Sequence, residues 1–139
     1  MGVEEMSVPE NTSTKKIILI DDDDEFRDML SRMLERAGYR VRGAQNGKIG
    51  VRFFKEDPPD LVITDLFMPE QEGLETIREL IRLDPKIKIM AISGGCTSLG
   101  LDFLPFAEAL GAVCIMPKPF SRKDILREIR ELISEGNAI

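Results

Sequence analysis

Residues 16–30 of the chain read KIILIDDDDEFRDML, and this stretch decides the fold. It opens with a short apolar run that ends in acid, which is the pattern of a buried strand at 16–21. A helical period then predicts a helix at 24–37, which Gly38 ends. The apolar positions of this helix are Phe26, Met29, Leu30, Met33 and Leu34. A buried strand that leads directly into a helix is the repeating unit of an α/β domain.

The same alternation of strand and helix continues along the chain. Apolar runs predict further strands at 60–65, 87–92 and 112–116, and the alternation in 39–43 (YRVRG) predicts a half-exposed strand. Helical periods predict further helices at 47–56, 72–83, 104–110 and 122–135. Ser121 and Asp124 make a capping-box-like start for the last of these helices. Alternating elements with right-handed crossovers predict an α/β fold with a doubly wound, five-stranded parallel sheet in the order 2-1-3-4-5.

The length of 139 residues suits one domain. Residues 1–14 are polar and have no period, which predicts a disordered tail or an added leader. We expect the folded domain to cover 15–136, with 137–139 as its C-terminal end. Because so few residues follow the last helix, we expect no second domain in this chain. The chain is then either a free-standing protein or a fragment of a longer one.

Composition argues against several classes of function. The formal net charge of −6 leaves no basic surplus to neutralise phosphates, so we expect no direct nucleic-acid partner. The chain has no histidine, which excludes histidine-based triads and histidine metal sites. Cys96 and Cys114 form no CxxC and are expected to be reduced thiols. Without an apolar run of ~18 residues or a signal peptide, we expect a cytoplasmic protein that makes no membrane contact.

Small or polar residues follow four of the predicted strands. They are Asp21 and Asp22, then Asp65, then Ser93 and Gly94, and finally Lys118. In a doubly wound sheet, ligands bind beyond the carboxyl ends of the strands. Three carboxylates close together repel one another unless they take up protons or hold a cation. Mg²⁺ is the natural cation, because it is hard, prefers oxygen ligands and needs few of them from the protein.

The other residues at this edge favour phosphoryl chemistry. Lys118 supplies a positive charge and Ser93 a hydroxyl, and together with Mg²⁺ they suit the oxygens of a phosphoryl group. Asp65 follows the strand nearest the middle of the sheet and is the expected nucleophile. Singly, Asp65 and Lys118 could be turn residues, and Asp23 or Asp24 could serve the helix dipole. These simpler explanations do not account for all the groups standing at matching strand ends.

Residues 17–126 resemble the receiver domain of response regulators from end to end. The matching stretches are IILIDDDDEFRDML, PDLVITDLFMPEQEGLE, IMAISGG and LGAVCIMPKPFS. The DLFMP and KPF pieces at their separation are the specific part of the match, whereas a pair of acids alone would not be. The resemblance implies a flavodoxin-like receiver fold and a two-component signalling domain rather than a conventional enzyme.

The resemblance also implies a metal site and a phosphorylation site. Asp65 is the implied phosphoacceptor. It would ligate Mg²⁺, with Mn²⁺ as a possible substitute, together with Asp22 and the backbone carbonyl of Phe67. Asp21 would act on the ion through water.

Further implied roles concern the phosphoryl group and the partners. Lys118 would pair with the phosphoryl oxygens, Ser93 would hydrogen-bond one of them, and the backbone N–H of Gly94 would assist. The Lys118–Pro119 bond would be cis. The implied phosphodonor is a histidine kinase or a phosphotransfer protein. The implied target is a protein that binds the face of the fourth helix, fifth strand and fifth helix, on a monomer or weak dimer.

Two features depart from the family pattern. Receivers usually carry an aromatic residue three places before the lysine, where this chain has Ile115. We therefore predict that switching uses the loop at 94–104 together with Phe103 or Phe106, although both aromatics also fit as ordinary core. Phe67, close to the acceptor, predicts slow self-dephosphorylation because a large apolar group there hinders attacking water.

Three rival interpretations fit less well. A haloacid-dehalogenase-type phosphatase needs a second Asp two residues after the nucleophile, where Phe67 stands. A flavodoxin-like cofactor binder needs a phosphate-cradling loop after the first strand, where DDDD would repel phosphate. A degenerate receiver used only for protein contacts is disfavoured because every acidic and basic site position is present.

Overall fold

The structure, a computed structural model, describes residues 14–65, 72–93 and 114–135. Its centre is a parallel sheet with the strand order β3-β2-β4-β5-β6. The strands are β2 (Lys16–Ile20), β3 (Arg40–Ala44), β4 (Leu61–Asp65), β5 (Ile89–Ser93) and β6 (Cys114–Pro117). Numbered along the chain, this order is 2-1-3-4-5, so the predicted doubly wound topology is confirmed.

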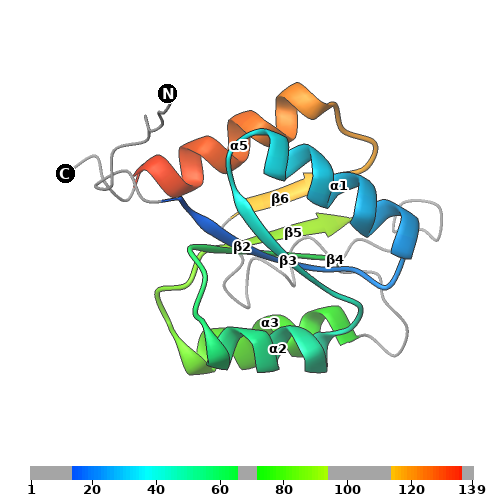
Figure 1. Ribbon diagram of the computed structural model, residues 1–139. Coiled ribbons are helices and arrows are strands. Elements are labelled where there is room, and N and C mark those ends of the chain that lie inside the picture. Colours follow the sequence, from blue (N-terminus) through cyan, green and yellow to red (C-terminus); the bar gives the residue numbers. More distant parts are fainter. Residues whose placement is uncertain (1–13, 66–71, 94–113, 136–139) are drawn as a thin grey trace, which may run out of the picture.

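Helices cover both faces of the sheet (Figure 1). Helices α1 (Asp24–Arg36) and α5 (Arg122–Glu135) lie on one face, and α2 (Gly47–Glu56) and α3 (Glu72–Leu83) lie on the other. Helices α2, α3 and α5 have the predicted bounds. Within the described ranges, no helix is long and apolar enough to cross a bilayer. The predicted helix at 104–110 lies outside the described residues, as do most of the predicted tail and the C-terminal end.

Two apolar clusters join the layers, one on each face of the sheet. Successive residues of β2 contribute to opposite clusters, as the alternation of side chains along a strand requires. Because both faces of the inner strands β2 and β4 are buried, these strands are largely apolar, which is why their runs stand out in the sequence. The outer strand β3 (RVRGA) is mostly exposed and alternates polar with apolar residues. The cluster under α1 and α5 includes Ile17, Leu19, Leu30, Leu34, Ile63, Ile125 and Ile129. The cluster under α2 and α3 includes Ile18, Ile20, Phe54, Val62, Ile77 and Leu80.

Local hydrogen bonds define both ends of α1. The Asp23 carboxylate accepts the backbone N–H of Phe26 at 3.1 Å, so Asp23 is the N-cap. At the other end, Gly38 has a φ of 104°, a conformation that glycine adopts without strain. The Tyr39 N–H donates to the carbonyl of Leu34 at 3.1 Å. Tyr39 therefore belongs to the helix cap, and β3 begins one residue later than predicted.

The predicted start of β5 is wrong by two residues, because a turn occupies 84–87. The Ile87 N–H donates to the Asp84 carbonyl at 3.1 Å, and the Lys86 N–H donates to the Asp84 carboxylate at 3.0 Å. Ile87 is buried in the core although it precedes the strand. An apolar residue in a turn therefore looked like the first residue of a strand. The other predicted limits differ by at most one residue where the ends are described.

Met29 is one of the apolar positions at helical spacing in α1, but it does not join the buried stripe of the helix. Its side chain is 48% exposed, whereas Leu30 and Leu34 are fully buried. The buried stripe of the helix is centred on these two leucines, and Met29 lies about a third of a turn away from Leu30. At that angle the side chain leaves the contact with the sheet and reaches solvent.

Candidate functional site

The carboxyl ends of β2, β4, β5 and β6 come together at one edge of the sheet. Pairing places Asp65, the last residue of β4, opposite Ile92, and Ser93, the last residue of β5, opposite Pro117. Asp21 directly follows β2, the neighbour of β4. The predicted site residues therefore stand on adjacent strands, although they are far apart in the sequence.

Three carboxylates form the centre of this edge. One oxygen from each of Asp21, Asp22 and Asp65 lies within 4.8 Å of the other two. Asp21 is fully buried and Asp65 is 6% exposed, whereas Asp22 is exposed. The Oδ2 atom of Asp21 is a buried oxygen with no hydrogen-bond partner among the described residues. A buried carboxylate oxygen without a donor costs free energy, so this cluster is suited to a cation with hard, oxygen-seeking character.

The electrostatic environment of Asp21 supports the same interpretation. Burial raises the pKa of its carboxyl above 3.8, and the neighbouring charge of Asp22 acts in the same direction. The hydrogen bond from the backbone of Asp23 and the positive charge of Lys118 oppose this shift in the pKa. A divalent ion would remove both the desolvation cost and the repulsion, so the residues present fit a Mg²⁺ site.

Backbone contacts hold Asp21 at the edge. Its N–H donates to the carbonyl of Ala44 at 3.0 Å, which extends the pairing of β2 with β3 by one residue. Its Oδ1 atom accepts the Asp23 N–H at 2.8 Å. The Arg27 guanidinium donates to the Asp21 carbonyl at 2.6 Å and pairs with Asp24 at 2.6 Å. Asp23 and Asp24 therefore build the start of α1, whereas Asp21 and Asp22 belong to the acidic cluster.

Lys118 follows β6 on the same edge and brings a positive charge. Its bond to Pro119 is cis, as predicted. The ammonium nitrogen lies 4.0 Å from the centre of the Phe26 ring, in cation–π geometry. Phe26 in turn meets Phe120 edge-on, with 6.2 Å between ring centres and 73° between planes. The sequence indicates Phe26 only as an apolar position of the first helix, and its contact with Lys118 was not predicted.

The structure leaves part of the predicted site open. The backbone of Ser93 lies at the end of β5, but its side chain is outside the described part of the structure. Phe67 and Gly94 also lie outside the described residues, as do Phe103, Phe106 and the side chain of Ile115. Of the predicted residues, the structure brings the carboxylates of Asp21, Asp22 and Asp65 together and places Lys118 at the same edge of the sheet.

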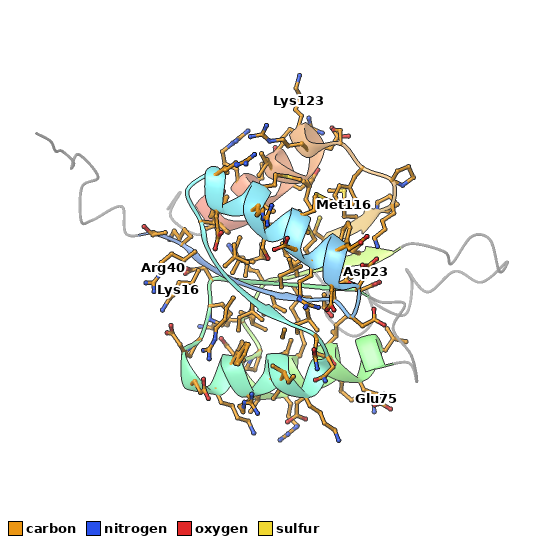
Figure 2. All side chains as sticks on the ribbon, turned by 45° about the vertical axis from the view of Figure 1, so that its right-hand side comes forward. Lys16, Asp23, Arg40, Glu75, Met116 and Lys123 are labelled. Carbon is orange, nitrogen blue, oxygen red and sulfur yellow. The ribbon has the colours of Figure 1, made fainter. Side chains whose placement is uncertain are left out.

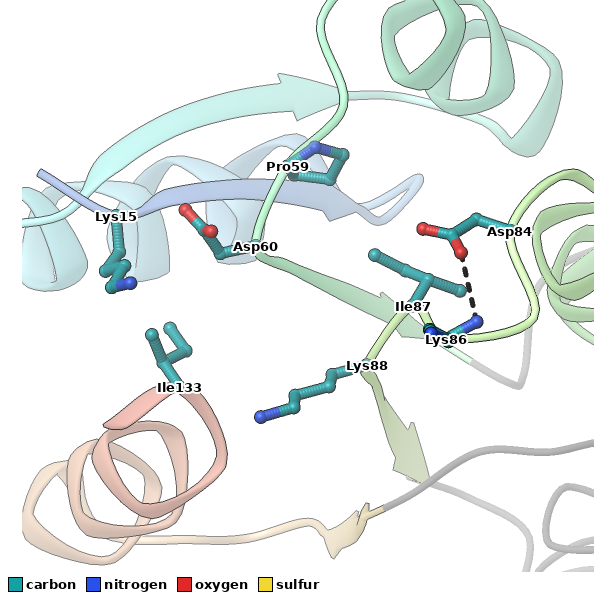
Figure 3. Close-up of a pocket in the computed structure, with 8 residues that line it drawn as sticks. All are labelled: Lys15, Pro59, Asp60, Asp84, Lys86, Ile87, Lys88 and Ile133. Carbon is teal, nitrogen blue, oxygen red and sulfur yellow. Dashed lines mark hydrogen bonds between the residues drawn. The ribbon is translucent and has the colours of Figure 1, made fainter. Parts of the chain in front are cut away.

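A pocket at the opposite edge of the sheet is lined by charged residues that hold the fold. Figure 2 shows Lys16 and Arg40 at that edge, away from Asp23. The pocket, of about 230 Å³, includes Lys15, Asp60, Asp84, Lys86 and Lys88 in its lining (Figure 3). Asp60 accepts the backbone N–H of Lys16 at 2.8 Å, and the Lys88 ammonium donates to the carbonyl of Leu132. These charges close the amino ends of the strands and lie far from the acidic cluster.

Comparison with known proteins decides the family. The family model described as the response regulator receiver domain matches residues 17–130. The chain belongs to the response regulator receiver family. The receiver is 35% identical over 119 residues to the response regulator receiver protein CpdR of Brucella abortus, covering 86% of this chain and 97% of the relative. It is 32% identical over 120 residues to the chemotaxis protein CheY of Thermotoga maritima, covering 85% and 97%.

A solved structure supports the same assignment for this receiver. The CheY-like receiver domain protein of Methanospirillum hungatei superposes with a TM-score of 0.80 at 27% identity, covering 90% of this chain and 98% of that chain. The predicted family and the flavodoxin-like receiver fold are therefore confirmed. The receiver takes part in two-component signalling, the role of its family.

Proposed function

We propose that this receiver accepts a phosphoryl group on Asp65. The observation that carries the proposal is the acidic cluster, in which a buried Asp21 oxygen meets no donor from the described residues and Asp65 is nearly buried beside it. Structural acids usually acquire hydrogen bonds or ion pairs when they are buried. An arrangement that leaves such an oxygen unpaired is typical of a functional site that expects a ligand.

The cation that fits this cluster is Mg²⁺, with Mn²⁺ as a substitute. Asp22 and Asp65 would bind the ion directly with the carbonyl of Phe67, and Asp21 would reach it through water. The bound ion would neutralise charge that builds up on the phosphoryl oxygens during transfer. In this arrangement the exposed Asp22 would meet the ion on the solvent side of the cluster and the buried Asp21 on its inner side.

The residues of the chain divide the remaining work. A carboxylate oxygen of Asp65 forms the bond to phosphorus while the phosphorus–nitrogen bond of the donor's phosphohistidine breaks, and the departing imidazole takes up a proton. Lys118 pairs with the phosphoryl oxygens, and Ser93 with the Gly94 N–H binds one of them. The phosphorylated form then shifts the population between two arrangements of the domain, through the segment at 94–104.

The proposed partners follow from this chemistry and from the charge of the chain. The donor is a histidine kinase or phosphotransfer protein, because the chain has no histidine of its own. The downstream target is a protein that binds the face between the fourth helix, β6 and α5. The net charge of −6 makes direct nucleic-acid binding unfavourable. We place the domain, 15–136, in the cytoplasm as a monomer or weak dimer.

The test is labelling with acetyl phosphate in the presence of Mg²⁺, followed by intact-protein mass spectrometry. We expect a mass gain of one phosphoryl group, lost in Asp65→Asn and in excess EDTA. Asp57→Asn is the matched control, because Asp57 is an exposed acid paired with Lys16 at the opposite edge of the sheet. Unchanged labelling of Asp65→Asn would overturn the proposal.

A further inference from the structure

The contact between Phe26 and Lys118 joins the first turn of α1 to the segment after β6. The Lys118 ammonium lies 4.0 Å from the centre of the Phe26 ring, and both side chains are partly buried. Lys118 directly follows β6, whose last residue pairs with Ser93 at the same edge of the sheet as the acidic cluster. One face of the ring therefore holds the cation at the mouth of the acidic cluster rather than away from it.

The Phe26 ring is fixed on its other sides. Its backbone N–H donates to the Asp23 carboxylate, which sets the first turn of the helix. Phe120 packs edge-on against the ring, and the apolar cluster under α1 and α5 supports it from within. A ring packed in this way presents one face to Lys118 and defines a position for its ammonium.

Lys118 is a flexible side chain that needs such a position. A lysine has four methylene groups and loses much rotamer freedom when its ammonium is held in one place. An ammonium carries three N–H donors, and contact with a ring face leaves donors free for oxygen atoms. A lysine held over the ring before phosphoryl transfer has already lost part of that freedom, so less remains to be lost as the reaction proceeds.

We propose that Phe26 is a positioning residue for phosphorylation, which holds the Lys118 ammonium by cation–π attraction where it will meet the phosphoryl group. The proposal rests on the proposed function of Asp65 and Lys118. In this role Phe26 acts on the reaction through Lys118. The electron density of its ring, and not only its shape, therefore contributes to the rate.

A fluorination series tests this role more sharply than truncation. Fluorine withdraws charge from the ring face in steps while the ring keeps nearly the same shape. Site-specific replacement of Phe26 by 4-fluoro-, 3,5-difluoro- and 3,4,5-trifluorophenylalanine should lower the rate of labelling by acetyl phosphate step by step. We expect about a twofold to fivefold loss over the series, the rate equivalent of a partly exposed cation–π contact.

Phe54 provides the matched control. It is 5% exposed and lies in the apolar cluster under α2 and α3, on the opposite face of the sheet. The same fluorinated series at Phe54 should leave the labelling rate unchanged. A flat series at Phe26, an equal fall at both positions, or a rate that rises as fluorines are added would each overturn the inference. A rising rate would mean that the ring withholds Lys118 from the reaction.

A spectroscopic measurement reports the contact without any phosphorylation. The ε-methylene protons of Lys118 should be shifted upfield by the ring current, in Phe26→Trp as in the wild type, and should return to ordinary values in Phe26→Leu. An unshifted Lys118 in the wild type would also overturn the inference. If the wild type shows the shift but is not labelled at all, both the proposed function and the positioning role fail. If it is labelled and the Phe26 series is flat, the positioning role alone fails.

Discussion

Replacing Asp21 by Asn should stabilise the folded protein when no divalent cation is present. Asp21 is fully buried, and its Oδ2 atom has no hydrogen-bond partner among the described residues. Asn has nearly the same shape and keeps an oxygen for the N–H of Asp23. The substitution therefore removes a charge with little effect on packing. Because a buried charge beside like charges raises the free energy of the folded state, its removal should lower that free energy.

The distances in the acidic cluster set the size of the effect. Asp21, Asp22 and Asp65 have oxygens within 4.8 Å of one another. At that separation, two full charges repel by about 3 kcal/mol at an effective dielectric constant of about 20, which suits the nearly buried Asp65. The exposed Asp22 is screened by water and adds about 1 kcal/mol at a dielectric constant of about 80. The lost attraction to Lys118 reduces the sum, which leaves a gain of about 1–3 kcal/mol.

Thermal and urea unfolding in EDTA measure this gain. For a domain of this size, the melting temperature of Asp21→Asn should exceed that of the wild type by about 3–10 °C. Asp57→Asn should not stabilise, because the hydrogen bond from Lys16 lowers the pKa of Asp57 and favours its charged form. Mg²⁺ should stabilise the wild type according to its concentration relative to Kd, and the Asn variant much less. An Asp21→Asn variant that is destabilised in EDTA, and still stabilised by Mg²⁺ to the full extent, would refute the reasoning.

Three further predictions concern pH, packing and thiol reactivity. Since the pKa of Asp21 is raised in the folded state, protonation of this carboxyl favours folding. In EDTA the stability gain of Asp21→Asn should therefore shrink as pH falls through that pKa and vanish below 3.8, and a gain that grows on acidification would contradict this. In Gly50→Ala the new Cβ would lie 2.4 Å from Cδ1 of the buried Ile20. Urea unfolding should therefore show a loss of about 1–3 kcal/mol in the free energy of unfolding, which Ile20→Val should partly restore, and a loss that Ile20→Val leaves unchanged would refute the clash. Burial and the Glu128 carboxylate raise the pKa of Cys114 to about 11. Iodoacetamide should therefore alkylate Cys114 more slowly in the folded than in the unfolded protein near neutral pH, as measured by peptide mapping, and equal rates would contradict this prediction.

Much of the fold could be predicted because its signals are local. The bounds of α2, α3 and α5 follow from helical periods that end at Pro or begin at Ser and Asn caps. The strand ends carried the candidate site, because parallel strands with right-handed crossovers place their carboxyl ends at one edge. The strand order alone therefore predicts that Asp21, Asp22 and Asp65 lie close together.

The errors arose where the period of a segment does not decide its environment. Met29 has the spacing of a core residue but lies at the margin of the buried stripe of α1. Ile87 is apolar and buried but belongs to a turn, because the hydrogen bonds to Asp84 occur before the strand begins. Met29 and Ile87 both fit the local apolar pattern, and only the packing of neighbouring elements decides that Met29 is exposed and that Ile87 lies in a turn.

The amino-acid sequence by itself determined the order of the elements, the edge at which the acids gather and the family to which the chain belongs. Those properties follow from local hydrogen bonds and from the spacing of apolar residues within short segments, both of which can be read from the sequence. Only the tertiary structure decided that Asp21 is buried, with one oxygen that meets no donor in the described part of the chain, while Asp22 faces solvent. It likewise decided that Phe26 meets Lys118. Burial and contact between distant segments result from how packed layers exclude water, and no single segment of the chain contains that information.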